Sequence, residues 1–207
     1  MVPVHSVVLR NRIEVEDPVR VVAGFLDAWR LDLAADAEPT SFGEADLRRA
    51  NRDGARISAI EIAAILERRR AIERSLREMP RNASLAGAAA TVPWGPLRHL
   101  FEGFAGIRGV GFAKMTKALH RKRPALVPML DSVVQAYLND DDLGPKAPFA
   151  EQALAFTRGY KRDLDRNRTA IRTVRREVER RGYALTEVRI LDLLIWSVQA
   201  DRRRLVE

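Results

Sequence analysis

The sequence contains no cysteine among its 207 residues. This absence excludes disulfide bonds, thiolate metal ligands and a cysteine nucleophile. The three histidines are scattered without ligand spacing, so a histidine metal site is not indicated. No hydrophobic run reaches the length of a membrane-spanning helix, and the early charges of residues 1–18 do not fit a signal peptide. We therefore expect a cytoplasmic protein without a membrane partner.

Acidic residues are fewer than basic ones, and the difference is large enough to suggest a partner. The chain has 36 Lys and Arg against 28 Asp and Glu, a net charge of +8 and a pI near 10.5. Such a balance favours polyanion binding. Most of the basic residues are arginine, which suits phosphate contacts, although a genome rich in G and C gives the same bias. The 46% hydrophobic content is ordinary for a globular protein.

Apolar residues recur at helical spacing along most of the chain, which predicts an all-α fold. Only residues 7–15 alternate weakly, as a short strand or an extended arm would. We expect helices over 19–33, 43–51, 59–79, 97–104, the segment after Gly111, the segment after Asp131, 148–181 (one helix or two broken near Gly159) and 186–198.

Local signals at the ends of these helices support the assignment. Asp17 before Pro18, a capping box over residues 41–44 and Ser58 mark helix starts. Gly182 marks a helix end. Pro93 to Pro96 is expected to form a rigid turn. On the core side we expect Ile60, Ala63, Ala64, Leu66 and Ile72 in one helix, and Leu191, Leu194, Ile195 and Trp196 in the last one.

The most informative stretch is residues 104–138. It contains the turn Ile107-Arg108-Gly109-Val110-Gly111, followed by a helix. Glycine allows a positive φ, and the free N–H groups at a helix start can hold a phosphate oxygen. Five cations follow on that helix: Lys114, Lys117, Arg121, Lys122 and Arg123. A Gly-x-Gly turn is also common without any ligand, and a charge run is usually a solvated face.

Asp131 lies in an apolar stretch, residues 126–134, that contains no lysine or arginine. Pro128 constrains the chain just before it. Asp131 or Ser132 is suited to cap the helix that follows. The alternative is a carboxylate held at a helix start, in a cleft, facing a reacting centre.

Together these residues resemble the helix-hairpin-helix DNA glycosylase superfamily, which includes endonuclease III and the adenine glycosylase MutY. The family pattern is a hydrophobic-x-Gly-hydrophobic-Gly hairpin, a helix, and a proline-containing segment that ends in the catalytic aspartate. Here the hairpin is residues 107–111, and Leu130-Asp131-Ser132-Val133 is close to the Leu-Asp-Gly-x-Val form of the adenine glycosylase branch. Gly111 and Asp131 are 20 residues apart, which agrees with the family spacing.

The resemblance implies a monomeric, two-lobed helical fold with a cleft for double-stranded DNA between the lobes. One lobe would combine residues 1–56 and 140–207, and the other would be residues 57–139 with the hairpin (104–121) and Asp131. Asp131 would stabilise the sugar cation and assist the attacking water. A monovalent cation would bind the backbone carbonyls of Ala105, Ile107 and Val110. The implied DNA contacts are Arg108, Gly109, Val110, Gly111, Lys114, Lys117, Arg121 and Lys122.

Two departures from the family pattern narrow the expected chemistry. Bifunctional members carry a lysine nucleophile at the position of Ala113, whereas Lys114 is one residue later, about 100° around the helix. We therefore expect no Schiff base and no strand cleavage. Without cysteine, the iron–sulfur cluster of many members is excluded. The expected function is a monofunctional DNA glycosylase, associated with the nucleoid, that hydrolyses the N-glycosidic bond of a damaged or modified base.

Two other functions stay open. The chain could be a non-catalytic module that binds DNA backbone or an unusual DNA structure, or a nuclease or lyase that uses Lys114. Trp94, His99 and Glu102 are candidates for base contacts, although a packed tryptophan, a surface histidine and a solvated glutamate are the commoner explanations. A second set of arginines within residues 168–181 is another candidate for DNA backbone contacts.

Overall fold

The protein was analysed as a computed structural model that describes residues 6–28 and 38–204. Within these residues the chain is mostly helical, as expected, with a single two-stranded antiparallel sheet. The α-helices are α1 (Pro18–Ala28), α2 (Glu44–Arg52), α3 (Ala59–Glu67), α4 (Arg69–Glu78), α5 (Trp94–Glu102), α6 (Phe112–His120), α7 (Ser132–Tyr137), α8 (Phe149–Arg166), α9 (Arg168–Arg180) and α10 (Glu187–Arg204). The strands are β1 (Val7–Val8) and β2 (Glu14–Val15), and short 3-10 helices lie at Arg10–Arg12, Ala89–Thr91 and Asn139–Asp141.

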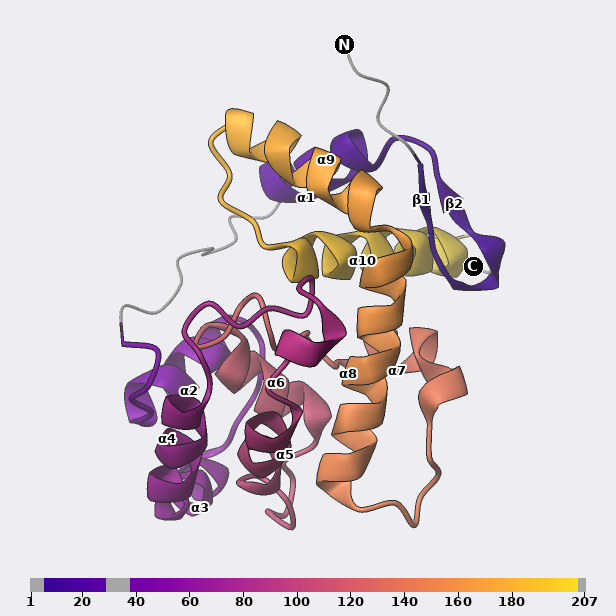
Figure 1. Ribbon diagram of the computed structural model, residues 1–207. Helices are drawn as coiled ribbons and strands as arrows, with labels where there is room; N and C mark the ends of the chain where they lie inside the picture. Colours follow the sequence, from indigo (N-terminus) through magenta and orange to yellow (C-terminus); the bar gives the residue numbers. More distant parts are fainter. Residues whose placement is uncertain (1–5, 29–37, 205–207) are drawn as a thin grey trace.

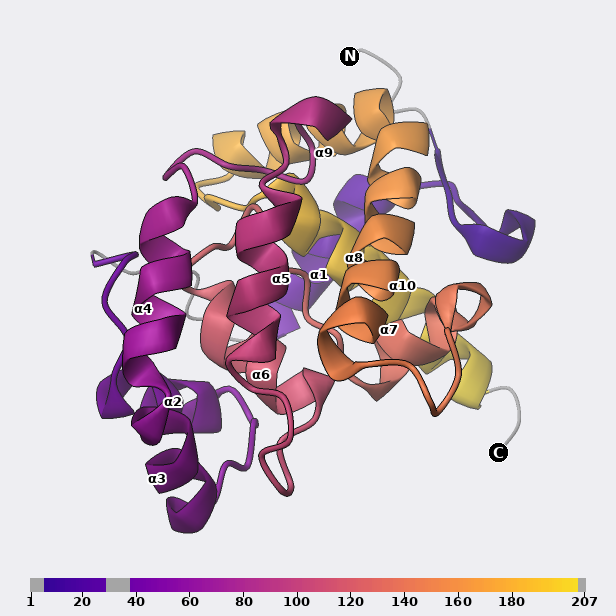
Figure 2. The same cartoon turned by 60° about the horizontal axis from the view of Figure 1, so that its bottom comes forward.

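The helices form two groups joined by α8 (Figure 1). In one group α1, α9 and α10 pack against one another, and α7 packs against α10. In the other, α2 packs against α3 and α6, and α4 packs against α5. The long helix α8 contacts α5 on one side and α9 and α10 on the other, and α5 and α8 lie side by side in both views (Figure 2). A continuous buried apolar core runs through both groups.

The grouping differs from the expected lobes at two places. Helix α2, expected with the terminal segments, packs with the middle of the chain, because Leu47 and Ala50 are buried there and Asp46 pairs with Lys122, just after α6. Helix α7, expected with the middle of the chain, packs on α10. Asp131 directly precedes α7 and therefore faces the C-terminal helix.

Several helix ends follow the local sequence signals. The Asp17 carboxyl accepts a hydrogen bond from the Arg20 N–H at 3.0 Å. The Ser58 hydroxyl accepts one from the Glu61 N–H, and the Glu61 carboxyl accepts one from the Ser58 N–H, which completes a capping box. Gly182 has a φ of 88° after α9. These predictions are confirmed because caps depend on a few neighbouring residues only.

Other predicted boundaries are wrong. The expected helix 59–79 breaks at Arg68, whose side chain donates to the Ala105 carbonyl at 2.7 Å. Ile60, expected in the core, is 83% exposed. Trp94 to Pro96 form the first turn of α5 rather than a separate turn, and the N-cap of α2 is Gly43, whose N–H donates to Asp46. The part of the expected helix from Trp29 to Leu33 lies outside the described residues.

The long segment 148–181 is broken at Asn167, not near Gly159. The Asn167 side chain pairs with the backbone of Val8 in β1, accepting from its N–H and donating to its carbonyl at 2.8 and 2.9 Å. Gly159 stays helical within α8, and the Asp141 carboxylate lies where a Cβ on Gly159 would be. Tertiary contacts therefore decide where this segment bends.

Candidate functional site

Asp131 is the N-cap of α7. Its Oδ1 accepts hydrogen bonds from the backbone N–H groups of Val133 and Val134, both at 3.0 Å. The backbone of Asp131 is extended, as an N-cap requires. The predicted cap is thus confirmed, and the carboxyl group is half-buried at the place where α7 meets α10.

The second oxygen of Asp131 is held by a tryptophan. Trp196 donates its indole N–H to Asp131 Oδ2 at 3.0 Å. Trp196 is 38% exposed, so the prediction that it is buried is wrong. The indole N–H needs an acceptor, and this side chain finds one only at the edge of the core. Three N–H donors therefore converge on one carboxyl group.

One face of α10 carries the groups around Asp131. Arg189, Asp192 and Trp196 follow the i, i+3, i+7 spacing of a helix face. Asp192 is fully buried, and its hydroxyl partner is Tyr160 of α8 at 2.9 Å. Burial raises the pKa of Asp192 from 3.8 to about 7, and the nearby Asp131 adds to this, while Arg189, Tyr160 and the Met129 N–H act in the opposite direction. Sequence reasoning missed Asp192, although an aspartate inside an apolar helix was a usable signal.

The segment before Asp131 is pinned by buried side chains. Thr116 of α6 accepts a hydrogen bond from the Leu130 N–H at 2.9 Å and donates to the Phe112 carbonyl at 2.8 Å. His120 Nδ1 lies 2.7 Å from the Val127 carbonyl, and Thr186 donates to the Pro124 carbonyl. Burial lowers the pKa of His120 to about 4, so its ring is neutral at pH 7. The helix after the glycine turn thereby sets the position of Asp131.

Replacing Thr116 with valine tests this link. The shape is kept, but the buried Leu130 N–H loses its acceptor, so the free energy of unfolding should fall by about 1–3 kcal/mol. Chemical denaturation would measure the change. Thr173→Val is the matched control, because Thr173 makes the same bond to its own helix (3.0 Å, to Thr169) but is only partly buried. Equal losses in both variants would contradict the special role of Thr116.

The glycine turn has the geometry that its sequence predicts. Gly106 and Gly109 have φ values of 72° and 83°. The Val110 N–H donates to the Ile107 carbonyl at 3.1 Å, which closes a β-turn with Gly109 at its third position. Ile107 and Val110 are buried, while Arg108, Gly109 and Gly111 are exposed. The apolar residues anchor the turn and leave its backbone open to solvent.

A carboxylate already lies beside this turn. Glu61 packs against the Cα of Gly109, and both of its oxygens pair with Lys114 Nζ at 2.7 and 2.8 Å. Burial raises the pKa of Glu61, but hydrogen bonds from Lys114 and Ser58 outweigh this and leave it below its ordinary value. The position expected to hold a DNA phosphate next to Lys114 is therefore lined by a negative charge.

The remaining cations of α6 mostly attach this helix to α2. Lys117 donates to the carbonyls of Asp53 and Gly54 at 3.2 and 3.3 Å, and Arg121 pairs with the Asp53 carboxylate at 3.0 Å. Lys122, expected to contact DNA, is 3% exposed and pairs with Asp46 at 2.8 Å. A lysine in the interior cannot contact a phosphate backbone, so Lys122 is removed from the contact set.

Other expected contacts are placed as follows. The Ala105 carbonyl accepts from Arg68, and the Ile107 carbonyl accepts from Val110, so a cation there would compete with both donors. The third carbonyl of the expected cation site is that of Val110. Among the side chains of the described residues, no group of three or more His, Cys, Asp or Glu could hold a metal ion.

The candidates for base contacts lie on α5. Trp94 is half-buried under the Arg158 guanidinium, whose carbon lies 5.3 Å from the ring centroid. Glu102 pairs with Arg98 at 3.3 Å, and His99 is exposed. Among the described residues, none of the three forms a hydrogen bond or ion pair with Asp131. Trp196, which sequence reasoning assigned to the core, is the aromatic residue that contacts it.

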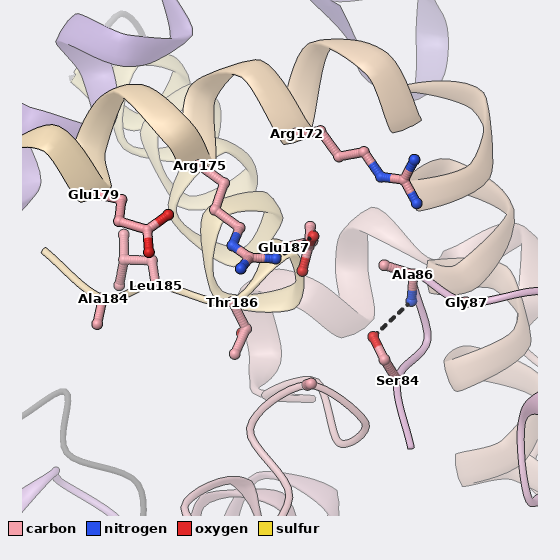
Figure 3. A pocket seen from close by; sticks show the side chains of 11 residues that line it. Ser84, Ala86, Gly87, Arg172, Arg175, Glu179, Ala184, Leu185, Thr186 and Glu187 are labelled. Atoms are coloured by element: carbon pink, nitrogen blue, oxygen red, sulfur yellow. Dashed lines mark hydrogen bonds and ion pairs between the residues drawn. The ribbon is translucent and has the colours of Figure 1, made fainter. Parts of the chain in front are cut away.

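A cavity of about 520 Å³ lies elsewhere, between α9, the loop 84–87 and the start of α10 (Figure 3). Arg172 and Arg175 extend into it from α9, and Arg175 pairs with Glu187 at 2.8 Å. Arg168 and Arg180 of the same helix are paired with Asp165 and Glu177. Asp131 does not line this cavity.

Among the helices that the structure describes, none is long and apolar enough to span a membrane.

Comparison with known proteins gives a family but no activity. No curated protein and no solved structure matches the chain. A family model covers residues 15–199, which include the turn, Asp131 and the face of α10 around it. The chain therefore belongs to the family described as "Family of unknown function (DUF6308)".

Proposed function

We propose that the protein is a monofunctional DNA glycosylase, which hydrolyses the N-glycosidic bond of a damaged or modified base in double-stranded DNA. The observation that carries the proposal is the half-buried Asp131 carboxyl, held by three N–H donors 20 residues after the glycine turn. A carboxylate fixed in this way can stabilise a cation without reorganising, which is the requirement for an electrostatic catalyst.

The reaction would use Asp131 in a single role. As the glycosidic bond breaks, the sugar gains positive charge, and Asp131 stabilises that charge and assists the attack of water on the sugar. The target nucleotide must leave the duplex first, at a cost of a few kcal/mol that is smallest for a damaged or mispaired base. Lys114 is engaged by Glu61 and is not proposed as a nucleophile.

DNA contact would centre on the turn. Arg108 is exposed, and so is the backbone of Gly111, whereas the Glu61 carboxylate lies beside Gly109 and would have to move for a phosphate to bind there. Lys114 would contribute a DNA contact by releasing the Glu61 carboxylate and pairing with a phosphate oxygen instead. Lys117 and Arg121 lie on the same helix, with part of their charge directed to α2.

Binding to three short duplexes at one salt concentration tests the proposal. One duplex is undamaged, one has a neutral abasic analogue, and one has a cationic pyrrolidine that mimics the sugar intermediate. We expect the cationic duplex to bind at least about 100-fold tighter, as transition-state analogues do. Asp131→Asn should abolish this preference and keep binding to the undamaged duplex, because asparagine is an equally good N-cap.

The control is Asp140→Asn. Asp140 is exposed and has no hydrogen bond or ion pair within the described part of the chain. This variant also removes one carboxylate charge, but at a position where the side chain has no partner among the described residues, and it should keep the preference for the cationic duplex. If Asp131→Asn also keeps it, the assignment of Asp131 as the catalytic residue is wrong.

A non-catalytic DNA-binding module is the second candidate. It is favoured by the observation that both oxygens of Asp131 are engaged within the protein. In that case the three duplexes bind alike, with a steep salt dependence. Asp131→Ala then lowers the free energy of unfolding by about 1 kcal/mol through loss of the cap and changes no preference.

A further inference from the structure

The contacts of Tyr160 constrain the position of a proton in the core. Its hydroxyl oxygen is 2.6 Å from the Val188 carbonyl and 2.9 Å from Asp192 Oδ1. Tyrosine has one O–H donor, and a carbonyl oxygen only accepts. The shorter contact has the normal length of an O–H···O bond. If Tyr160 donates to Val188, its contact with Asp192 needs a proton from Asp192.

The surroundings of Asp192 agree with a neutral carboxyl group. Asp192 and Tyr160 are both 0% exposed, so a charge there has no water. Asp192 Oδ2 has no hydrogen-bond partner in the described structure, which an ionised oxygen tolerates poorly. The nearest guanidinium nitrogen, on Arg189, is 3.9 Å away and is also 3.6 Å from the Met129 sulfur.

Asp192 also faces Asp131. The groups that act on it are Tyr160 of α8, Arg189 of α10, the Met129 N–H and the Asp131 carboxylate at the start of α7. The Asp131 carboxylate repels a negative charge on Asp192, and a proton on Asp192 removes this repulsion. Because Asp131 accepts three N–H bonds and Asp192 accepts none from a cation at normal length, the proton belongs on Asp192.

We propose that Asp192 is a neutral carboxylic acid below neutral pH, which donates a hydrogen bond to Tyr160 and leaves Asp131 as the one negative charge at the candidate site. In this role Asp192 is a positioning residue that acts through Asp131. The part of the proposal that concerns the reaction depends on the proposed glycosylase function, whereas the part that concerns the proton does not.

The proton can be located without DNA. In protein labelled with ¹³C at the aspartate carboxyl groups, one resonance should titrate with a midpoint near pH 7, as the raised pKa of Asp192 requires. In the Asp192→Asn variant that resonance should be missing. If every aspartate resonance of the wild-type protein titrates below about pH 5, near ordinary aspartate values, the proposal is overturned.

Stability gives a second, independent readout. A group whose pKa is higher in the folded state stabilises the fold at low pH, and this contribution is lost as pH rises to the folded-state value. The folding equilibrium constant of the wild type, divided by that of Asp192→Asn, should therefore fall by up to about tenfold per pH unit between about pH 4 and pH 7. His120 has the opposite dependence, but it is present in both proteins and cancels. A ratio independent of pH in this range would contradict the proposal.

The role at the candidate site is tested with the cationic duplex. Above pH 7, ionised Asp192 adds a second negative charge beside Asp131, so the affinity of the wild-type protein for the cationic duplex should rise with pH. The total rise should be up to about tenfold for each unit by which the bound cation lowers the pKa of Asp192. Asp192→Asn should bind the cationic duplex at a constant level across this range. If wild type and variant share one pH profile, the positioning role is wrong. If neither prefers the cationic duplex but the resonance near pH 7 is present, the glycosylase proposal fails and the neutral Asp192 stands.

Discussion

Gly159→Ala should lower the free energy of unfolding by about 3 kcal/mol, although alanine is the better helix former by about 1 kcal/mol. Gly159 lies within α8, and a Cβ there would overlap the Asp141 carboxylate and come within 2.9 Å of the Arg10 guanidinium. Asp141 and Arg10 are nearly buried, with side chains 9% and 10% exposed. Because these groups have no free space to move into, the added methyl group should break their ion pair or displace α8.

Gly24→Ala is the matched control for this substitution. Gly24 lies inside α1, and no atom of the described residues is within 4 Å of the position its Cβ would take. Alanine there should stabilise the protein by up to about 1 kcal/mol. Urea denaturation of both variants measures the two changes. If Gly159→Ala is also stabilising, the close packing of Asp141 against α8 is wrong.

Arg10→Met should lower the free energy of unfolding by up to about 3 kcal/mol, because two largely buried carboxylates each lose a charged partner and, among the described residues, keep only one other, Arg166 for Asp163 and Arg162 for Asp141. Arg10 pairs with Asp163 at 2.7 Å and Asp141 at 2.6 Å, and Asp163 is fully buried. The guanidinium of Arg10 also lies over the Tyr137 ring, whereas the bond to the Tyr137 hydroxyl at 3.2 Å comes from the backbone N–H of Arg10 and is kept in the variant. Methionine keeps much of the apolar stem, so the loss is mainly that of the charge.

The control for Arg10→Met is Arg20→Met. Arg20 is 87% exposed at its side chain and lies 4.0 Å from Asp17, so its replacement should change stability by no more than about 0.5 kcal/mol. In a double mutant, Gly159→Ala and Arg10→Met should cost less together than the sum of their separate effects, because both act on one network. Additive effects would show that the two positions are independent.

This network also bears on the candidate site. Tyr137 is the last residue of α7, and Asp131 is its N-cap. The short helix is thus held at one end by Trp196 and at the other by Arg10. The N-terminal arm and the C-terminal helix together fix the carboxyl group.

From the sequence alone, the helical fold, most helix positions, the cap formed by Asp131 and the exposed glycine turn could be predicted. Each depends on residues a few positions apart, through helix periodicity, capping and the positive φ of Gly109. The absence of cysteine likewise settled which sulfur chemistry is excluded. These properties are local or compositional, so no knowledge of the packing was needed.

Only the tertiary structure decided which charged groups pair with one another and which residues contact Asp131. Glu61 and Lys114 are 53 residues apart in sequence, and their pairing puts a carboxylate beside the glycine turn. Trp196 contacts Asp131 across 65 residues. The breaks at Arg68 and Asn167 depend on Ala105 and Val8, which are 37 and 159 residues away along the chain. Helical periodicity identifies a buried face, but which polar group meets which on that face depends on how the helices pack.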